Sequence, residues 1–267
     1  MLKDITLGQY FPGESFVHRL DPRLKIMLSL IYIVVIFLVQ SFWGYGLILL
    51  FTGLVVSTSK VPVSYMLRGL KPIMFFIILT ALLNLFMTKS GDVLVSWWIL
   101  AITDEGLYLA AFMVLRLMFL IIGSSILTLT TSPISLTDGI ERLLSPYKRI
   151  GIPAHELAMM MTIALRFIPT LLEETDKIMK AQAARGADFE SGNVIKRAKA
   201  LIPILIPLFV SAFRRADELA TAMECRCYKG GEGRTRLKQL KYTRIDAYAT
   251  LLMIVFTAGI VLINMTL

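Results

Sequence analysis

Long uncharged hydrophobic runs alternate along this chain with polar segments that are rich in lysine and arginine. No charge lies between Lys25 and Lys60 or within residues 247–267. A helix that crosses a bilayer needs roughly 20 apolar residues, so residues 247–267 predict one span. Residues 26–59 are too many for one ordinary span and predict a hairpin of two short ones. Polar and small residues predict its turn, namely Gln40, Ser41, Gly44 and Gly46.

Two further hydrophobic runs, at about 72–88 and 106–130, bring the predicted number of spans to five. Between these two runs, most of the charged residues in 89–105 are acidic, which predicts an external loop. Upstream of all spans, Asp21-Pro22 predicts the start of the first helix, because Asp caps helix N-termini and Pro fits the first turn.

The basic residues predict the orientation of the spans and three parts of the chain. Of the 28 lysines and arginines, 19 lie in residues 131–245. Basic loops stay on the cytoplasmic side of a membrane, so this region is predicted to be cytoplasmic. The chain then divides into a membrane domain at 1–131, a cytoplasmic domain at 132–245 and a last span at 246–267.

Helical periodicity predicts three helices in the cytoplasmic domain, a short one over 133–144 and long ones over 154–184 and about 193–227. The last contains LIPILIPLFV, a 10-residue apolar run between Lys199 and Arg214. This run is too short to span a bilayer and predicts a surface for a partner or for the membrane domain. This surface is predicted to include Pro203, Leu205, Pro207 and Leu208. The two prolines also predict a bend in the helix.

A short pattern, Asp-x4-Ala-x3-Arg, occurs near the end of each long helix. The first copy runs from Asp176 to Arg185 and the second from Asp217 to Arg226. Small neighbours let a partner surface approach the backbone, and a guanidinium binds carboxylates or carbonyls through forked donors. The pattern predicts a docking site, with Ala183, Ala184 and Gly186 beside Arg185 and Cys225 beside Arg226. A simpler interpretation is a cation that interacts with a helix C-terminus.

Composition and missing motifs limit the possible functions. The chain is 56% hydrophobic, with a mean hydropathy of +0.71 and a net charge of +9. No nucleic-acid module accompanies the charge, so cytoplasmic basic loops explain it better. No phosphate-binding loop, HExxH or Gly-x-Ser-x-Gly motif occurs. Cys225 and Cys227 lack a second ligand pair, so zinc is not expected. We therefore expect a protein that is not an enzyme and relies on partners for chemistry.

Arg116 is the one charge far from the end of a predicted span. An intramembrane arginine is a functional hypothesis by default, whereas a structural arginine packs between helices or extends to the interface. The sequence leaves both interpretations open, with Asn84 as a candidate polar companion.

The opening GQYFPGESFVHRLDPRLK, the Ala184-Arg185-Gly186 triplet and the five spans together resemble the transmembrane T component of energy-coupling factor transporters, the vitamin and trace-metal importers of prokaryotes. The resemblance covers essentially the whole chain. Arg226 occupies the second signature site, but its neighbours are Cys225 and Cys227 rather than Ala and Gly. The implied fold is an all-α integral membrane protein with two long, crossing coupling helices and one short helix in the cytoplasm.

The resemblance also implies partners and a mechanism. Two similar or identical ATP-binding subunits would bind ATP and magnesium, and each would receive one arginine-bearing helix end. Their closure would move the coupling helices and change the contact with a separate substrate-binding membrane subunit, the S component. No cofactor and no nucleic acid are implied for this chain itself.

Three alternatives remain at this point. A conventional importer permease also docks to ATPases, but it usually inserts one short coupling loop. A membrane enzyme would use Glu156, Glu173 or Glu174 with His155 and would work without an ATPase. A membrane scaffold would bind partners without supporting ATP-dependent uptake.

Overall fold

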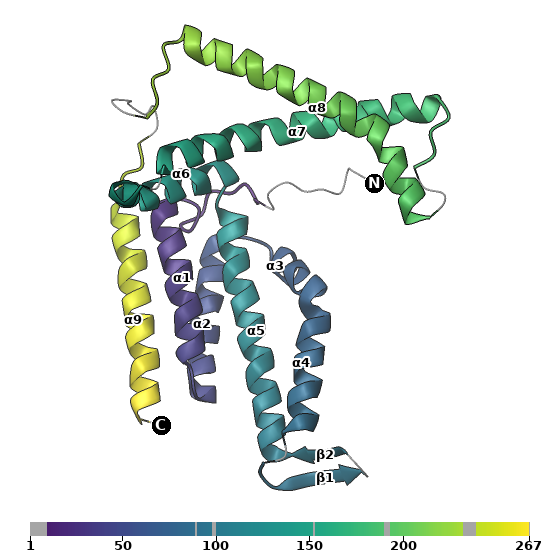
Figure 1. Cartoon of the computed structure of the whole chain (residues 1–267). Helices are drawn as coiled ribbons and strands as arrows, with labels where there is room; N and C mark the ends of the chain where they lie inside the picture. Colours follow the sequence, from purple (N-terminus) through teal and green to yellow (C-terminus); the bar gives the residue numbers. More distant parts are fainter. Residues whose placement is uncertain are drawn as a thin grey trace. The chain divides into compact units, whose positions relative to one another are not determined.

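The computed structural model describes residues 10–88, 90–97, 100–151, 153–189, 193–231 and 239–266. The described residues form two units. The bundle unit lies within residues 8–139 and 239–267, and the long-helix unit lies within residues 140–238. Nearly all of both units is helical (Figure 1), which confirms the predicted all-α class.

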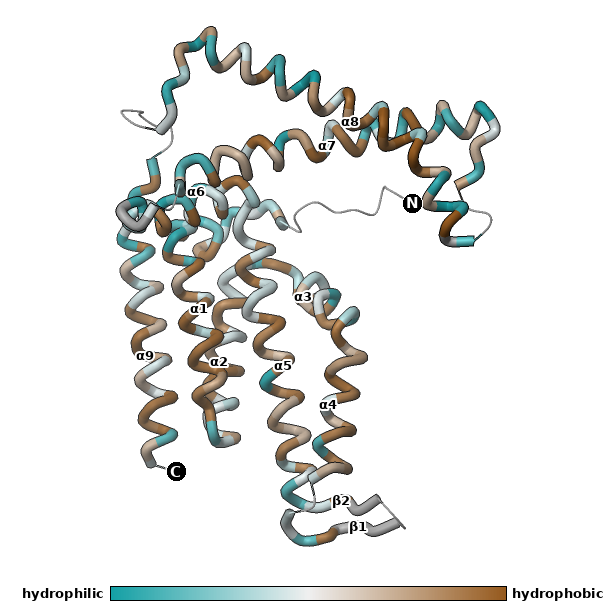
Figure 2. The backbone as a smooth tube through the Cα atoms, viewed as in Figure 1, coloured by the Kyte–Doolittle hydropathy of each residue, from teal (hydrophilic) through white to brown (hydrophobic). Residues whose placement is uncertain are grey.

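Six α-helices and one short 3-10 helix make most of the described part of the bundle unit. Their bounds are α1 Pro22–Leu38, α2 Phe42–Ser59, α3 Val63–Leu70, η2 Lys71–Ile73, α4 Met74–Met87, α5 Asp104–Thr130 and α9 Arg244–Thr266. The 27-residue α5 is central and packs against α1, α2, α3 and α4, while α9 packs against α1 and α2. Hydrophobic residues predominate along these helices (Figure 2).

The first two helices form the predicted hairpin, but Gly44 and Gly46, which were predicted to lie in its turn, both lie inside α2. The chain breaks at residues 39–41, so Gly44 lies inside α2 rather than in the turn. A Cβ atom on Gly44 would lie 2.7 Å from Cγ1 of Val39. Gly44 therefore allows close packing of α2 against the turn, which is a different use of the same residue type.

A β-hairpin joins α4 to α5 where the sequence predicted a loop. Strands β1 (Val93–Trp97) and β2 (Leu100–Thr103) pair antiparallel, with Trp97 opposite Leu100. Their β-branched and aromatic residues favour this pairing. The Thr103 hydroxyl then accepts from the amide of Gly106 at 3.1 Å and caps α5. Trp98, between the two strands, lies outside the described residues.

Among the described residues, five helical stretches are long and apolar enough to cross a membrane. Five spans were predicted, but the structure selects a different set of segments. They are Phe42–Ser59, Val63–Met87, Asp104–Thr130, Ala154–Ala184 and Arg244–Thr266. Helix α1, with 17 residues, is at the lower limit for a span. Ala154–Ala184 qualifies by its apolar first half, although it also carries Glu156, Arg166 and Glu173.

Buried polar groups tie the N-terminal segment to distant parts of the bundle unit. The Lys25 ammonium donates to the carbonyls of Thr130 at 2.9 Å and His18 at 3.2 Å and to the Thr131 hydroxyl at 3.3 Å. Three acceptors match the three donors of an ammonium. These three hydrogen bonds satisfy the charged side chain of Lys25, a residue that is only 6% exposed.

Asp21 and Asp246 form the second part of this junction. The Asp21 amide donates to Asp246 Oδ1 at 2.8 Å, and the Asp21 carboxylate accepts two hydrogen bonds from the Arg23 guanidinium. Burial alone would raise the pKa of Asp21, but the hydrogen bonds and charge of Arg23 outweigh it and lower this pKa. Asp21 also accepts from the Arg23 amide, which confirms it as the cap of α1.

The long-helix unit consists mainly of two helices that pack against each other, α7 (Ala154–Ala184) and α8 (Val194–Cys225). Before them lie α6 (Pro133–Leu144), which begins in the bundle unit, and η3 (Ser145–Ile150). Gly151, with φ +90°, ends η3 in the left-handed conformation that glycine adopts easily.

Candidate functional site at the ends of the two long helices

The C-terminus of α7 ends in a Schellman motif with Arg185 as its cap. The amide of Ala187 donates to the carbonyl of Gln182 at 3.0 Å, and the amide of Gly186 donates to that of Ala183 at 3.0 Å. Gly186 has φ +88°, the left-handed conformation that this motif requires. The backbone geometry thus terminates the helix directly after Arg185.

The C-terminus of α8 has the same geometry 41 positions later. The amide of Tyr228 donates to the carbonyl of Met223 at 3.0 Å. The amide of Cys227 donates to the backbone carbonyl of Glu224 at 2.8 Å. Cys227 takes the left-handed position with φ +57°. Arg226 is therefore the structural equivalent of Arg185, which extends the sequence repeat to the level of individual hydrogen bonds.

The two ends differ in how easily they adopt this conformation. Glycine has no steric penalty at positive φ, whereas a residue with a Cβ loses roughly 1 kcal/mol there. Within the described residues, only Lys60 and Cys227 are non-glycine residues with positive φ. The second end therefore keeps the geometry of the first despite the less favourable residue.

The predicted docking residues lie on accessible surface at both ends. Arg185 and Arg226 are exposed, and so are their small neighbours Ala183, Ala184 and Cys225. In the described part of the chain, neither arginine forms a salt bridge with a carboxylate. Among the described residues, no carboxylate thus competes with an external acceptor for either guanidinium.

The helices cross at equivalent positions of the repeat. The 41-residue offset aligns Glu174 with Arg215, and these two side chains form an ion pair at 3.0 Å between α7 and α8. Each pair member lies 11 residues before its arginine cap, or about 16 Å along the helix. The two helical arms beyond the crossing are thus equal in length and point to opposite sides (Figure 1).

The crossing pair is the part of the site that the sequence analysis missed. From the sequence, Glu174 is a candidate only for the active site of a membrane enzyme. The available signal was the charge pattern: when the repeat is extended upstream, Glu173 and Glu174 align with Arg214 and Arg215. Equivalent positions that meet at a crossing need opposite charges, since like charges would repel.

The predicted apolar surface on α8 is largely accessible. Pro203, Leu205 and Pro207 are exposed, and Leu208 is half-buried. Ile204, between them, is only 3% exposed. The run appears as a continuous hydrophobic stretch in Figure 2, and α8 bends in its N-terminal part in Figure 1. The prolines explain a bend because neither supplies a backbone N–H to the helix.

Of the residues of the possible membrane enzyme, Glu173 and Glu174 do not converge with His155. His155 pairs with Glu141 at 3.1 Å, and Glu174 pairs with Arg215. Glu173 lies 18 residues beyond His155, or about 27 Å along α7. Cys225 and Cys227 are both exposed free thiols, and no group of three metal-ligating side chains occurs among the described residues.

Comparison with known proteins gives a consistent result. A family model described as "Cobalt transport protein" (CbiQ) matches residues 13–237. The energy-coupling factor transporter transmembrane protein EcfT of Clostridium kluyveri is 64% identical over 252 residues, which cover 94% of this chain and 93% of that protein. The protein of the same name from Ruminiclostridium cellulolyticum is 59% identical over an alignment that covers 99% of this chain and 98% of that protein. That of Bacillus subtilis is 49% identical and covers 97% of both.

Proposed function

The chain belongs to the family of energy-coupling factor transporter transmembrane proteins, and from this premise we propose that it is the coupling subunit of an ATP-driven importer. It transmits the movement of two similar or identical ATP-binding subunits to a separate substrate-binding S component. ATP and magnesium belong to those partners, and this chain is not itself an enzyme. It resides in a prokaryotic cell membrane, with the long-helix unit in the cytoplasm.

The observation that carries this proposal is the duplicated helix end. Arg185 and Arg226 cap two helices through the same hydrogen-bond pattern, so two partners with the same kind of groove can each receive one end. An exposed arginine offers forked donors to carboxylate or carbonyl acceptors in such a groove. Small neighbours such as Ala184 and Cys225 leave room for the partner backbone.

The crossing explains how the two ends would move together. When ATP brings the two ATP-binding subunits together, the arginine-bearing ends move with them. The Glu174–Arg215 pair holds the helices at their crossing, so movement of the ends becomes rotation of α7 against α8. The apolar surface around Pro203, Leu205 and Pro207 then changes its contact with the S component or with the membrane domain.

Co-purification with the ATP-binding subunits tests the docking. We expect Arg185→Glu and Arg226→Glu each to weaken the complex and the double variant to lose it, because the carboxylate repels the acceptors that bind the guanidinium. Arg197→Glu, a change at an exposed arginine near the start of α8, is the matched control and should retain the complex. Binding of the folded double variant at the wild-type level would contradict the proposal.

A further inference from the structure

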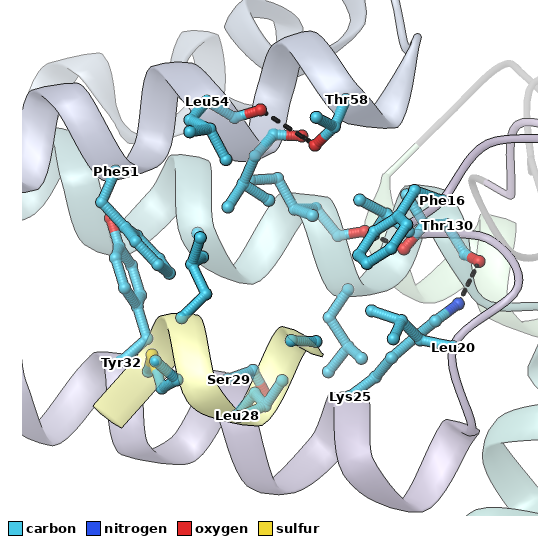
Figure 3. A pocket seen from close by; sticks show the side chains of 18 of the residues that line it. Phe16, Leu20, Lys25, Leu28, Ser29, Tyr32, Phe51, Leu54, Thr58 and Thr130 are labelled. Carbon is cyan, nitrogen blue, oxygen red and sulfur yellow. Dashed lines mark hydrogen bonds between the residues drawn. The ribbon is translucent and has the colours of Figure 1, made fainter. Parts of the chain in front are cut away.

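The bundle unit contains an apolar cavity of about 380 Å³ that the proposed coupling function does not use. Helices α1, α2, α5 and α9 line it, together with the N-terminal segment at Phe16, Val17 and Leu20. In Figure 3, Tyr32 and Phe51 lie at one end of the cavity, and Leu20, Lys25 and Thr130 lie at the other.

An aromatic cluster closes the first end. The rings of Phe51 on α2 and Phe256 on α9 stack at 4.1 Å, and Tyr32 on α1 stacks against both at 6.0 and 6.3 Å. Gly123 on α5 allows this arrangement, since a Cβ atom there would clash with the Tyr32 ring. The packed aromatic rings close this end, which we call the aromatic floor, so the cavity does not continue along the bundle there.

The polar side chains of the wall bond to the protein itself. Ser29, Thr58 and Thr130 each donate to a carbonyl of the preceding helical turn at 2.7 to 2.9 Å. The Tyr32 and Thr52 hydroxyls bond to each other at 2.8 Å, and Lys25 has its three acceptors. A cavity whose polar groups are already paired binds hydrocarbon rather than water or a polar ligand.

The most exposed wall residues indicate where the cavity opens. Thr58 and Leu54 on α2 are exposed, as are Tyr248 and Leu252 on α9 and Phe16 in the N-terminal segment. The opening therefore lies between α2 and α9. Both helices are long and apolar enough to span a membrane, so this opening faces lipid acyl chains.

Two basic residues lie beside this opening. Lys60 is exposed and follows Thr58 by two residues at the end of α2, where its amide bonds to the carbonyl of Ser57. Arg244 is exposed and precedes Tyr248 by four residues, which places both on one face of α9. Cations at the cytoplasmic end of spans attract anionic headgroups of the adjacent leaflet.

We propose that this cavity binds one acyl chain of an anionic phospholipid from the cytoplasmic leaflet, with the lipid phosphate held by Lys60 and Arg244. The chain fills the space between α2 and α9 above the aromatic floor. The bound lipid fixes the spacing of these two helices along the cavity, in addition to the Phe51–Phe256 stack and the close approach of Gly259 to Leu47.

Native mass spectrometry of the full chain in a neutral detergent tests this site. The probes are dioleoyl phosphatidylglycerol and, as the zwitterionic comparison, dioleoyl phosphatidylcholine. We expect the wild type to retain one phosphatidylglycerol and to bind phosphatidylcholine more weakly. Lys60→Ala and Arg244→Ala should each reduce the preference for phosphatidylglycerol by about fivefold, the contribution of one cation near an anionic headgroup.

A cavity-filling change separates this site from nonspecific lipid. Leu252→Trp places an indole in the cavity and should abolish the retained lipid. Leu251→Trp changes the neighbouring leucine, which is 59% exposed and is not in the wall, and should leave it unchanged. Thr58→Phe fills the cavity from α2 if the first variant fails to fold.

Three results would overturn the proposal. They are a wild type that retains no phospholipid, equal affinity for both lipids, and folded cavity-filled variants that retain phosphatidylglycerol at the wild-type level.

Discussion

At the scale of single residues, the position after each arginine cap shows how one backbone geometry accommodates two different side chains. Gly186 and Cys227 occupy the same left-handed position in two equivalent Schellman motifs. Because cysteine is strained there and glycine is not, the end of α8 should open more readily than the end of α7.

Cys227→Gly should therefore stabilise the end of α8 by about 0.5 kcal/mol. Glycine removes the strain of the left-handed conformation, and its greater freedom in the unfolded chain offsets part of that gain. Hydrogen exchange of the amides of residues 226–228 should slow by about twofold. Cys225→Gly is the control, because residue 225 is helical and glycine there should speed exchange. Equal exchange in wild type and Cys227→Gly would show that the strain is absent.

Arg116 has a structural role within the bundle. Its Nη2 donates to the carbonyl of Val39, the C-terminal cap of α1, at 3.3 Å, and its guanidinium lies 5.0 Å from the Phe112 ring centre. Asn264 of α9 donates to the preceding carbonyl, that of Leu38, at 2.6 Å. Side chains of α5 and α9 thus satisfy the free carbonyls of α1 where lipid offers no donor.

Replacing this arginine distinguishes the structural interpretation from the functional one. Arg116→Leu should lower the free energy of unfolding by about 2 kcal/mol, because the Val39 carbonyl loses its donor. Thermal unfolding in detergent measures this loss. Substrate uptake by the reconstituted complex, well below the unfolding temperature, should persist. Loss of uptake by a folded Arg116→Leu variant would favour a transport role.

At the scale of secondary-structure elements, the relation between α7 and α8 matters more than either helix alone. The two have nearly the same length, 31 and 32 residues, and cross at equivalent repeat positions. The Glu174 and Arg215 side chains are 24% and 36% exposed. Solvent therefore weakens their attraction, and the pair fixes the position of the crossing more than it stabilises the fold.

Exchanging the two charges tests this relation. Glu174→Arg and Arg215→Glu alone each place like charges together and should lower both thermal stability and ATP-driven uptake. The double exchange should restore them, with a coupling energy of about 1 kcal/mol. The control exchanges Glu14 and Arg19, an exposed ion pair that lies outside both long helices, and should change neither quantity. Failure of the double exchange to recover uptake would exclude the pair as a positioning contact.

At the scale of the whole molecule, the described residues divide into an apolar bundle unit and a unit of two long amphipathic helices. This division suits the proposed coupling role, in which one part would anchor in the bilayer and the other would present two equivalent ends to soluble partners. Apolar length alone does not distinguish the parts, since α7 also qualifies as a span. The side of the membrane on which the arginine caps lie must be measured directly.

The two native cysteines serve as reporters for that measurement. Cys225 and Cys227 are the only cysteines of the chain, both are exposed, and they flank Arg226. A membrane-impermeant maleimide should label them in inverted vesicles but not in intact cells. Bound ATP-binding subunits should reduce the labelling. Labelling from outside intact cells would contradict the proposed cytoplasmic position, and Cys225→Ser with Cys227→Ser supplies the unlabelled control.

The sequence by itself determined the features that depend on neighbours along the chain. Uncharged runs define the spans because lipid excludes charge, and helical periodicity defines α6, α7 and α8. The repeat and its two arginines were likewise readable from spacing. The left-handed backbone at Cys227 was not, because nothing in its own residue type favours that conformation.

The tertiary structure decided which distant groups satisfy one another. Lys25 meets Thr130 across 105 positions, Asp21 meets Asp246 across 225, and Glu174 meets Arg215 across 41. A buried polar group needs a partner, but many residues along a chain could supply it. Only the packing of the helices selects one, and the same packing creates the apolar cavity between α2 and α9.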